Sequence, residues 1–219
     1  MNRKENYNAI KNQLPAGVQL VAVSKTHPAE AVLEVYHFGQ KIFGENKVQE
    51  LMEKYPVLPQ DIQWHLIGHL QTNKVKYIAP FIDTIQSVDS EKLLSEISKE
   101  AGKNNRTIKV LLQVKIAAEE SKFGLEIAEA KALFKDYVDG KFSNIHITGL
   151  MGMATFTDDK EQVKEEFLLL KGLFDELNQL KTLETLSMGM SDDFPAAIEC
   201  GANSVRVGSA IFGRRDYSK

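Results

Sequence analysis

Short apolar runs rich in β-branched residues alternate along the chain with longer segments in which apolar residues recur every three or four positions. The first pattern predicts buried strands and the second predicts amphipathic helices. The run LVAV at positions 20–23 is typical of a strand covered on both faces, as in parallel α/β sheets. The predicted strands are Val18–Ser24, Lys41–Phe43, Gln63–Ile67, Thr84–Ser87, Ile108–Val114, His146–Leu150, Thr185–Met188 and Ser204–Val207.

The segments between these strands carry helix signals. Pro28 opens one of them at a position where a first helical turn tolerates proline. In the segment 191–201, Ser191 is predicted to be the N-cap and Gly201 the terminator. The longest helical segment, 158–180, repeats its apolar residues at Val163, Phe167, Leu170, Phe174 and Leu177.

Eight strands with helices between them, after a helical N-terminus, predict an α/β fold: a closed (β/α)8 TIM barrel with an extra N-terminal helix. A doubly wound open sheet is the alternative. Because no linker rich in proline, serine or glycine divides the chain, we expect residues 1–219 to form a single domain.

Composition and charge exclude several function classes. Among 219 residues, 43% are hydrophobic and 26% are charged, which is ordinary for a globular protein. A formal net charge of -3 gives no general attraction to nucleic acid. Cys200 is the single cysteine, so no internal disulfide or cysteine metal cluster can form, and we expect it in the core. The sequence offers neither a signal peptide nor a membrane span, so a cytoplasmic location is expected.

In a barrel of this kind, functional groups gather at the carboxyl ends of the strands. Lys25 stands there after the first predicted strand. This stretch alone leaves two interpretations open, a site residue or a lysine that extends into solvent. Further residues expected at the same mouth are Glu45, Asn46, His65 and Met151, together with the loops after the seventh and eighth strands.

Those last two loops commonly form the phosphate site of barrel enzymes. Gly189 allows a tight turn, Ser191 offers a hydroxyl beside a helix N-terminus, and Gly208 and Ser209 supply a second small, amide-rich bend. Taken singly, Ser191 could merely cap a helix and Gly208 could merely close a turn. Because carboxylates repel a phosphate, the side chains of residues 192 and 193, both aspartates, are expected to point away from it.

Six segments occur in an order that resembles the pyridoxal phosphate homeostasis proteins, also called the YggS or PROSC family. The segments are AVSKTHP, FGENKVQE, WHLIGHLQTNK, GLMGMATF, LSMGMSDDFPAAI and VRVGSAIFG. The resemblance spans essentially the whole chain. It implies a barrel like the N-terminal domain of alanine racemase, of the PLP fold type III, with pyridoxal 5'-phosphate held as a Schiff base on the lysine that matches Lys25.

The same resemblance implies a set of residues around that cofactor. Ser191, Gly208 and Ser209 match phosphate-binding positions, although many relatives carry threonine where this chain has Ser209. Arg206 matches the arginine that faces the pyridine nitrogen; a surface ion pair is the alternative for this residue. An arginine there disfavours the pyridinium form and weakens the ring as an electron sink. The implied cofactor-binding residues are Lys25, Asn46, His65, Ser191, Arg206, Gly208 and Ser209, with a satisfied core histidine as the alternative for His65.

Two lysines leave questions open. Lys115 stands where the family usually shows asparagine, so its contacts cannot be taken from the resemblance. Lys122, in the segment SKFG, matches a family lysine near the mouth and could act as a secondary amine for the aldehyde. A solvated loop lysine is the alternative for Lys122.

Three functions fit these features. A carrier that binds pyridoxal phosphate reversibly and delivers it to apo-enzymes needs a Schiff-base lysine and a phosphate cradle. A racemase-like enzyme also needs a second acid or base on the opposite face of the ring, which alanine racemases take from an additional β domain. A class I aldolase for a sugar phosphate would use the same lysine chemistry, but the family motifs give it no support. We expect the carrier, with no catalytic residue, no metal and a monomeric state.

Overall fold

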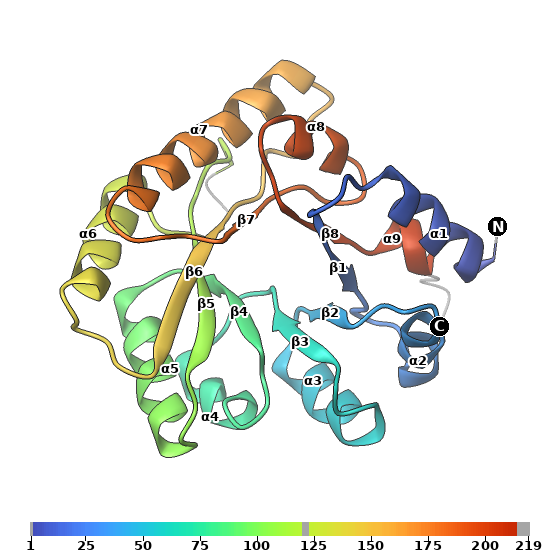
Figure 1. Cartoon of the computed structure of the whole chain (residues 1–219), viewed down its shortest axis with the longest axis horizontal. Helices are drawn as coiled ribbons and strands as arrows, with labels where there is room; N and C mark the ends of the chain where they lie inside the picture. Colours follow the sequence, from blue (N-terminus) through green and yellow to red (C-terminus); the bar gives the residue numbers. More distant parts are fainter. Residues whose placement is uncertain (1, 120–122, 214–219) are drawn as a thin grey trace.

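The computed structural model describes residues 2–119 and 123–213 of the chain, and these form a barrel of parallel strands surrounded by helices (Figure 1). Strand order follows chain order, from the first strand around to the eighth, and the sheet closes on itself. The strands are β1 Gln19–Val23, β2 Ile42–Glu45, β3 Gln63–Leu66, β4 Thr84–Val88, β5 Ile108–Gln113, β6 Ile145–Met151, β7 Thr185–Ser187 and β8 Ser204–Val207.

The first and last strands close the barrel. They pair in parallel, from Gln19 opposite Ser204 to Ala22 opposite Val207. The predicted closed barrel is therefore confirmed, and the alternative open sheet is wrong. All eight predicted strands are present, and the largest difference is in β2, which continues to Glu45. A single domain over residues 1–219 stays a prediction.

Helices cover the outside of the barrel (Figure 1). The predicted N-terminal helix is confirmed as α1, and the long helical segment as α7. The helices are α1 Arg3–Gln13, α2 Ala29–His37, α3 Val48–Lys54, α4 Val75–Ile78, α5 Glu91–Lys103, α6 Ile127–Val138, α7 Lys160–Asn178, α8 Phe194–Glu199 and α9 Ser209–Phe212, with short 3-10 turns at Tyr55–Val57 and Thr72–Lys74.

The predicted start of α8 is wrong, whereas its end is confirmed. The N-cap is Asp193 and not Ser191, because the chain makes an additional tight turn before the helix begins at Phe194. At the other end, Gly201 adopts a φ of 97°, a left-handed conformation that stops the helix at little steric cost.

Side chains alternate between the two faces of the barrel wall. In β3, Trp64 and Leu66 pack in the apolar layer under the helices, while His65 lines a small cavity with other polar residues. In β4, Ile85 joins the apolar layer, and Gln86 reaches Ser187 of β7 across the interior. Because side-chain direction alternates along each strand, apolar residues fill the layer between strands and helices, while these polar residues face the barrel interior. Cys200 is buried in this apolar layer, as expected.

Across residues 2–119 and 123–213, the structure contains no helix with the length and hydropathy needed to span a bilayer. The same described residues hold no cluster of three or more histidine, cysteine, aspartate or glutamate side chains arranged to bind a metal ion.

Candidate functional site

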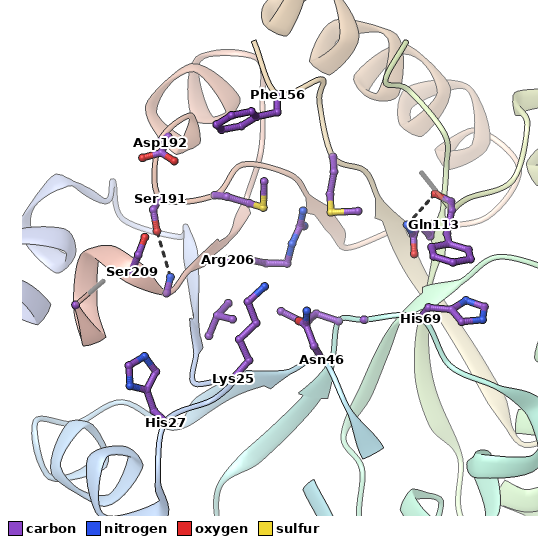
Figure 2. A pocket seen from close by; sticks show the side chains of 18 residues that line it. Lys25, His27, Asn46, His69, Gln113, Phe156, Ser191, Asp192, Arg206 and Ser209 are labelled. Carbon is purple, nitrogen blue, oxygen red and sulfur yellow. Dashed lines mark hydrogen bonds between the residues drawn. The ribbon is translucent and has the colours of Figure 1, made fainter. Parts of the chain in front are cut away.

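A cavity of about 480 Å³ opens among the loops that follow the carboxyl ends of the strands. It brings together six of the seven predicted cofactor-binding residues, which come from four different strand ends or loops. They are Lys25, Asn46, Ser191, Arg206, Gly208 and Ser209. Figure 2 shows the Lys25 side chain extending into the cavity, with Ser191 and Ser209 on one side and Asn46 on the other.

Lys25 is half-buried and lies in a tight turn between β1 and α2. The amide of His27 donates to the carbonyl of Ser24 across this turn, at 3.1 Å. Thr26 has a φ of 67°, which is uncommon for a β-branched residue, and its amide donates to Oε2 of Glu50 at 2.6 Å. A hydrogen bond to Glu50 of α3 therefore stabilises the strained residue next to Lys25 and fixes the position of the lysine backbone.

A buried ion pair lies behind this turn. Nζ of Lys54 lies 2.6 Å from Oε1 of Glu45 and donates to the carbonyl of Ser24 at 2.9 Å. The Ser24 hydroxyl also donates to Oε1 of Glu45, at 2.6 Å. Burial raises the pKa of Glu45 to about 7, although Lys54 and Ser24 act to lower it.

Two residues that we expected at the mouth lie elsewhere. Glu45 does not line the cavity, because its side chain turns outward from β2 to meet Lys54 on α3. Met151, the last residue of β6, is fully buried and does not line the cavity either. Glu45 stands at a strand end in the sequence, but the alternation of side chains along β2 sends it away from the opening.

The loops after β7 and β8 meet on one side of the cavity. Gly189 has a φ of 93°, and a Cβ built there would lie 2.8 Å from Cα of Phe194 and 2.6 Å from Cβ of Ala197. This close approach places Ser191 beside the next loop, where its Oγ accepts from the amide of Gly208 at 3.3 Å. Ser209 follows at the start of α9 (Figure 2). Two hydroxyls and the amides of a tight bend are thus gathered at one place.

The two aspartates after Ser191 behave differently from each other. Oδ1 of Asp193 accepts from the amide of Met190, and this residue does not line the cavity. Asp192 is exposed and lies at the edge of the cavity (Figure 2). The expectation that both side chains point away from a bound phosphate therefore stays a prediction.

Arg206 is only 4% exposed, and its guanidinium contributes to the floor of the cavity. Nη1 donates to Oγ of Ser187 at 2.6 Å, and Nη2 donates to the carbonyl of Gly152 at 2.9 Å. Burial lowers the pKa of Arg206 to about 10. Because this value is still well above neutral pH, the side chain remains a cation. The alternative of a surface ion pair for Arg206 is wrong.

His65 is absent from this cavity. It lies within β3 and lines a separate cavity of about 110 Å³ together with Asp83, Thr84 and Lys109. Its Nδ1 is 2.8 Å from Nε2 of Gln86, so it is a hydrogen-bonded interior histidine. The predicted position of His65 at the mouth is therefore wrong.

Two histidines that sequence reasoning missed, His27 and His69, line this cavity (Figure 2). The ring of His69 stacks on Phe123, with centroids 4.2 Å apart, and its Nδ1 lies 3.0 Å from Oδ2 of Asp89. The sequence does contain a signal: His65 falls inside the apolar run of β3, whereas His69 follows Gly68 in the loop after the strand. In a barrel, that loop belongs to the mouth.

The structure describes only one of the two lysines whose contacts or roles the sequence left open. Lys115 lies 3.4 Å from Oε1 of Glu126 and does not line the cavity. Lys122 lies outside the described residues.

Comparisons with known proteins give a consistent result. The family description "Alanine racemase, N-terminal domain" matches residues 2–216. The chain is 43% identical over 202 residues to the "Pyridoxal phosphate homeostasis protein" of Aquifex aeolicus, covering 91% of this chain and 88% of the relative. The human protein of the same name is 42% identical, with 92% of this chain and 78% of the relative covered.

Solved structures agree with this picture. PipY of Synechococcus elongatus superposes with a TM-score of 0.91 and 38% identity without PLP, over 97% of this chain and 100% of that chain. The structure of PipY with PLP bound gives a TM-score of 0.89 and 37% identity, with the same shares covered. An alanine racemase of Clostridium difficile is similar in fold alone, with a TM-score of 0.75 and 16% identity over 99% of this chain and 58% of that chain.

Proposed function

Since the chain belongs to the pyridoxal phosphate homeostasis proteins, with the barrel of the alanine racemase N-terminal domain, we propose that it binds pyridoxal 5'-phosphate reversibly on Lys25. In this proposal it takes part in intracellular vitamin B6 homeostasis by delivering the cofactor to apo-enzymes. It works as a monomer in the cytoplasm and does not catalyse a reaction of its own.

The observation that carries the proposal is that one cavity holds an amine, a phosphate cradle and a buried guanidinium. When bound, pyridoxal phosphate supplies an aldehyde that condenses with an amine and releases water. Lys25 is the amine, because its side chain extends into the cavity. Ser191, Ser209 and the amides near Gly208 suit a phosphate, since they offer small hydrogen-bond donors.

Close packing at Gly208 supports this cradle. A Cβ built on Gly208 would lie 3.1 Å from the carbonyl oxygen of Val23 and 3.2 Å from Cβ of Val23. The absence of a side chain thus lets the β8–α9 bend lie directly against the end of β1, next to Lys25. The phosphate donors and the amine are held at a fixed distance as a result.

Arg206 constrains the protonation state of the bound ring. A guanidinium has donors and no acceptor, so it can only donate to a ring nitrogen that carries no proton. Its two bonds to Ser187 and Gly152 hold it in place. A ring without a proton on its nitrogen is a weaker electron sink than a pyridinium.

Reduction with borohydride tests the amine. The protein is loaded with pyridoxal phosphate and reduced, and the modified peptides are mapped. We expect one adduct, on Lys25, in the wild type and none at that peptide in Lys25→Ala. Lys115→Ala is the matched control and should keep the adduct, because Lys115 lies outside the cavity. An adduct on Lys122, or adducts scattered over surface lysines, would contradict the proposal.

Delivery is tested by mixing the loaded protein with an apo-enzyme that needs pyridoxal phosphate. We expect the activity of that enzyme to appear, together with loss of the protein's visible absorbance. The loaded protein is also incubated with each enantiomer of alanine. Sustained racemisation there would favour the alternative, a racemase-like enzyme.

A further inference from the structure

Five side chains form a continuous polar path through the barrel interior, which we call the interior chain. It begins at Arg206, whose Nη1 donates to Oγ of Ser187 at 2.6 Å. Oγ of Ser187 lies 2.7 Å from Oε1 of Gln86, and Nε2 of Gln86 lies 2.8 Å from Nδ1 of His65. Nε2 of His65 is 3.6 Å from Oδ2 of Asp83.

The interior chain joins two cavities. Arg206 lines the cavity that contains Lys25, while His65 and Asp83 line the smaller cavity of about 110 Å³. Ser187 and Gln86, which lie between the two cavities, are both 0% exposed. Buried polar groups are costly unless they are hydrogen-bonded. Each member therefore depends on its neighbours for its orientation.

In each hydrogen bond of the interior chain, the donor is the residue nearer to Arg206. A guanidinium only donates, so Oγ of Ser187 accepts from Arg206 and its own proton goes to Oε1 of Gln86. The amide nitrogen of Gln86 is then left to donate to Nδ1 of His65. That assignment leaves the proton of a neutral imidazole on Nε2, toward Asp83.

Burial favours this neutral form of His65. Burial lowers the pKa of the imidazole, and the charge of Lys109 acts in the same direction. Asp83 opposes them and acts to raise this pKa. Other charged groups also face this end: Lys109 lies 3.4 Å from Oδ1 of Asp83, and Glu184 lines the same small cavity. At the far end of the chain, Asp193 acts on Arg206 and favours its charged form.

We propose that Gln86 and His65 are positioning residues that orient the Arg206 guanidinium toward the ring nitrogen of the bound cofactor, although neither residue lines the cofactor cavity. The inference rests on the proposed function in one respect, that the ring faces Arg206. A protonated His65 would donate from Nδ1 and require the Gln86 amide to turn over. Ser187 would then accept from Gln86 as well as from Arg206, and the bond that holds Nη1 would weaken.

The first test needs no cofactor. NMR spectra of the ¹⁵N-labelled full chain report which imidazole nitrogen of His65 carries the proton. At neutral pH we expect the neutral form with the proton on Nε2. In Gln86→Leu we expect the Arg206 guanidinium signals to move. A proton on Nδ1, or unchanged Arg206 signals in this variant, would overturn the inference.

The second test uses the loaded protein and follows its visible absorbance against pH. Gln86→Leu should shift the pH midpoint of the cofactor spectrum and weaken pyridoxal phosphate binding several-fold. His65→Leu should change both quantities in the same direction. Thr148→Val is the matched control, because Thr148 is buried, lines the same small cavity and lies outside the interior chain. This control should leave the spectrum unchanged.

A role through Arg206 makes the effects non-additive. The double variant Gln86→Leu/His65→Leu should match Gln86→Leu, and Gln86→Leu should add nothing further in an Arg206→Gln background. Additive effects would indicate a merely structural role and would overturn the inference. Should His65→Leu fail to fold, Gln86→Leu and Arg206→Gln still test the inference, since neither variant changes His65.

The two proposals fail in distinguishable ways. If borohydride leaves no adduct on Lys25, the proposed function fails, whereas the NMR experiment still decides the direction of the interior chain. If the adduct forms on Lys25 and the spectra of the Gln86 and His65 variants match the wild type, only the positioning role is wrong.

Discussion

Lys25 is held from behind by groups that do not line the cavity. Glu50 accepts from the amide of Thr26, and Lys54 donates to the carbonyl of Ser24, so α3 fixes both residues that flank the lysine. Glu45 completes this group as the buried partner of Lys54. A change at Glu45 should therefore be felt in the stability of the turn that carries Lys25.

The raised pKa of Glu45 makes a prediction about stability and pH. Burial raises this pKa from 4.5 to about 7, so the folded state binds the proton more tightly than the unfolded state does. The stabilisation by protonated Glu45 is complete below about pH 4.5 and is lost as the pH rises to about 7. Relative to Glu45→Gln, the free energy of unfolding of the wild type should fall by roughly 1 to 3 kcal/mol across this window.

Urea unfolding of both proteins at a series of pH values measures this difference. Glu50→Gln is the control with the opposite sign. Burial acts to raise the pKa of Glu50, but the Thr26 amide and Lys54 outweigh it, so the net shift is downward. Relative to Glu50→Gln, wild-type stability should fall as the pH drops below about 4.5. A wild-type stability that stays at a constant offset from Glu45→Gln would contradict the raised pKa of Glu45.

Single residues also mark where sequence reasoning succeeds and where it fails. Lys25 and Arg206 could be placed because each stands at the end of an apolar strand. His65 was predicted to line the mouth in place of His69. Only counting along the strand shows that His65 falls inside β3. The partner of Glu45 was not predictable, because Lys54 is a helix residue with an unremarkable sequence context.

At the level of elements, the turn between β7 and α8 is the strictest requirement of the site. Gly189 combines a positive φ with no room for a Cβ. Gly189→Ala should lower the free energy of unfolding by roughly 2 kcal/mol or more and weaken pyridoxal phosphate binding, because it displaces Ser191. Thermal unfolding and cofactor titration measure the two effects.

Gly172→Ala is the matched control. Gly172 lies within α7, where a Cβ would meet nothing within 4 Å. Alanine there should stabilise the protein by up to about 1 kcal/mol because of its higher helix propensity, and binding should not change. Equal losses of stability in the two variants would show that the conformation of Gly189 is not what matters.

Elements were the most predictable part of the fold, and their caps were less so. The strands follow from runs of apolar and β-branched residues, which leave little choice of structure. The start of α8 does not follow in the same way. Ser191 has the side chain of an N-cap, but its hydroxyl accepts from Gly208 of a distant loop, so that a tertiary contact replaces the local one.

For the whole molecule, cofactor binding and stability should be linked. A ligand that binds only the folded state raises the free energy of unfolding by about 2.7 kcal/mol at a hundredfold excess over its dissociation constant. We expect pyridoxal phosphate to raise the melting temperature of the wild type, and Lys25→Ala to lose most of that rise. A full rise in Lys25→Ala would mean that the phosphate and ring contacts suffice without the amine.

The closed barrel could be predicted because eight strands alternate with helices along the chain. The interior chain could not be predicted. Ser187, Gln86 and His65 are separated by long stretches of sequence, and each has the appearance of an ordinary polar strand residue. His65 and Gln86 lie on the neighbouring strands β3 and β4, and only closure of the sheet brings Ser187 of β7 to Gln86 across the barrel.

The pairing of β1 with β8 also has a consequence for biosynthesis. Lys25 follows the first strand that the ribosome makes, whereas Arg206 and Gly208 belong to the last strand or follow it. A nascent chain therefore exposes the amine long before the guanidinium and the second half of the proposed phosphate cradle exist. In the proposed function, capture of the cofactor must wait until β8 has left the ribosome, so that a bound cofactor indicates that all eight strands of the barrel have been made.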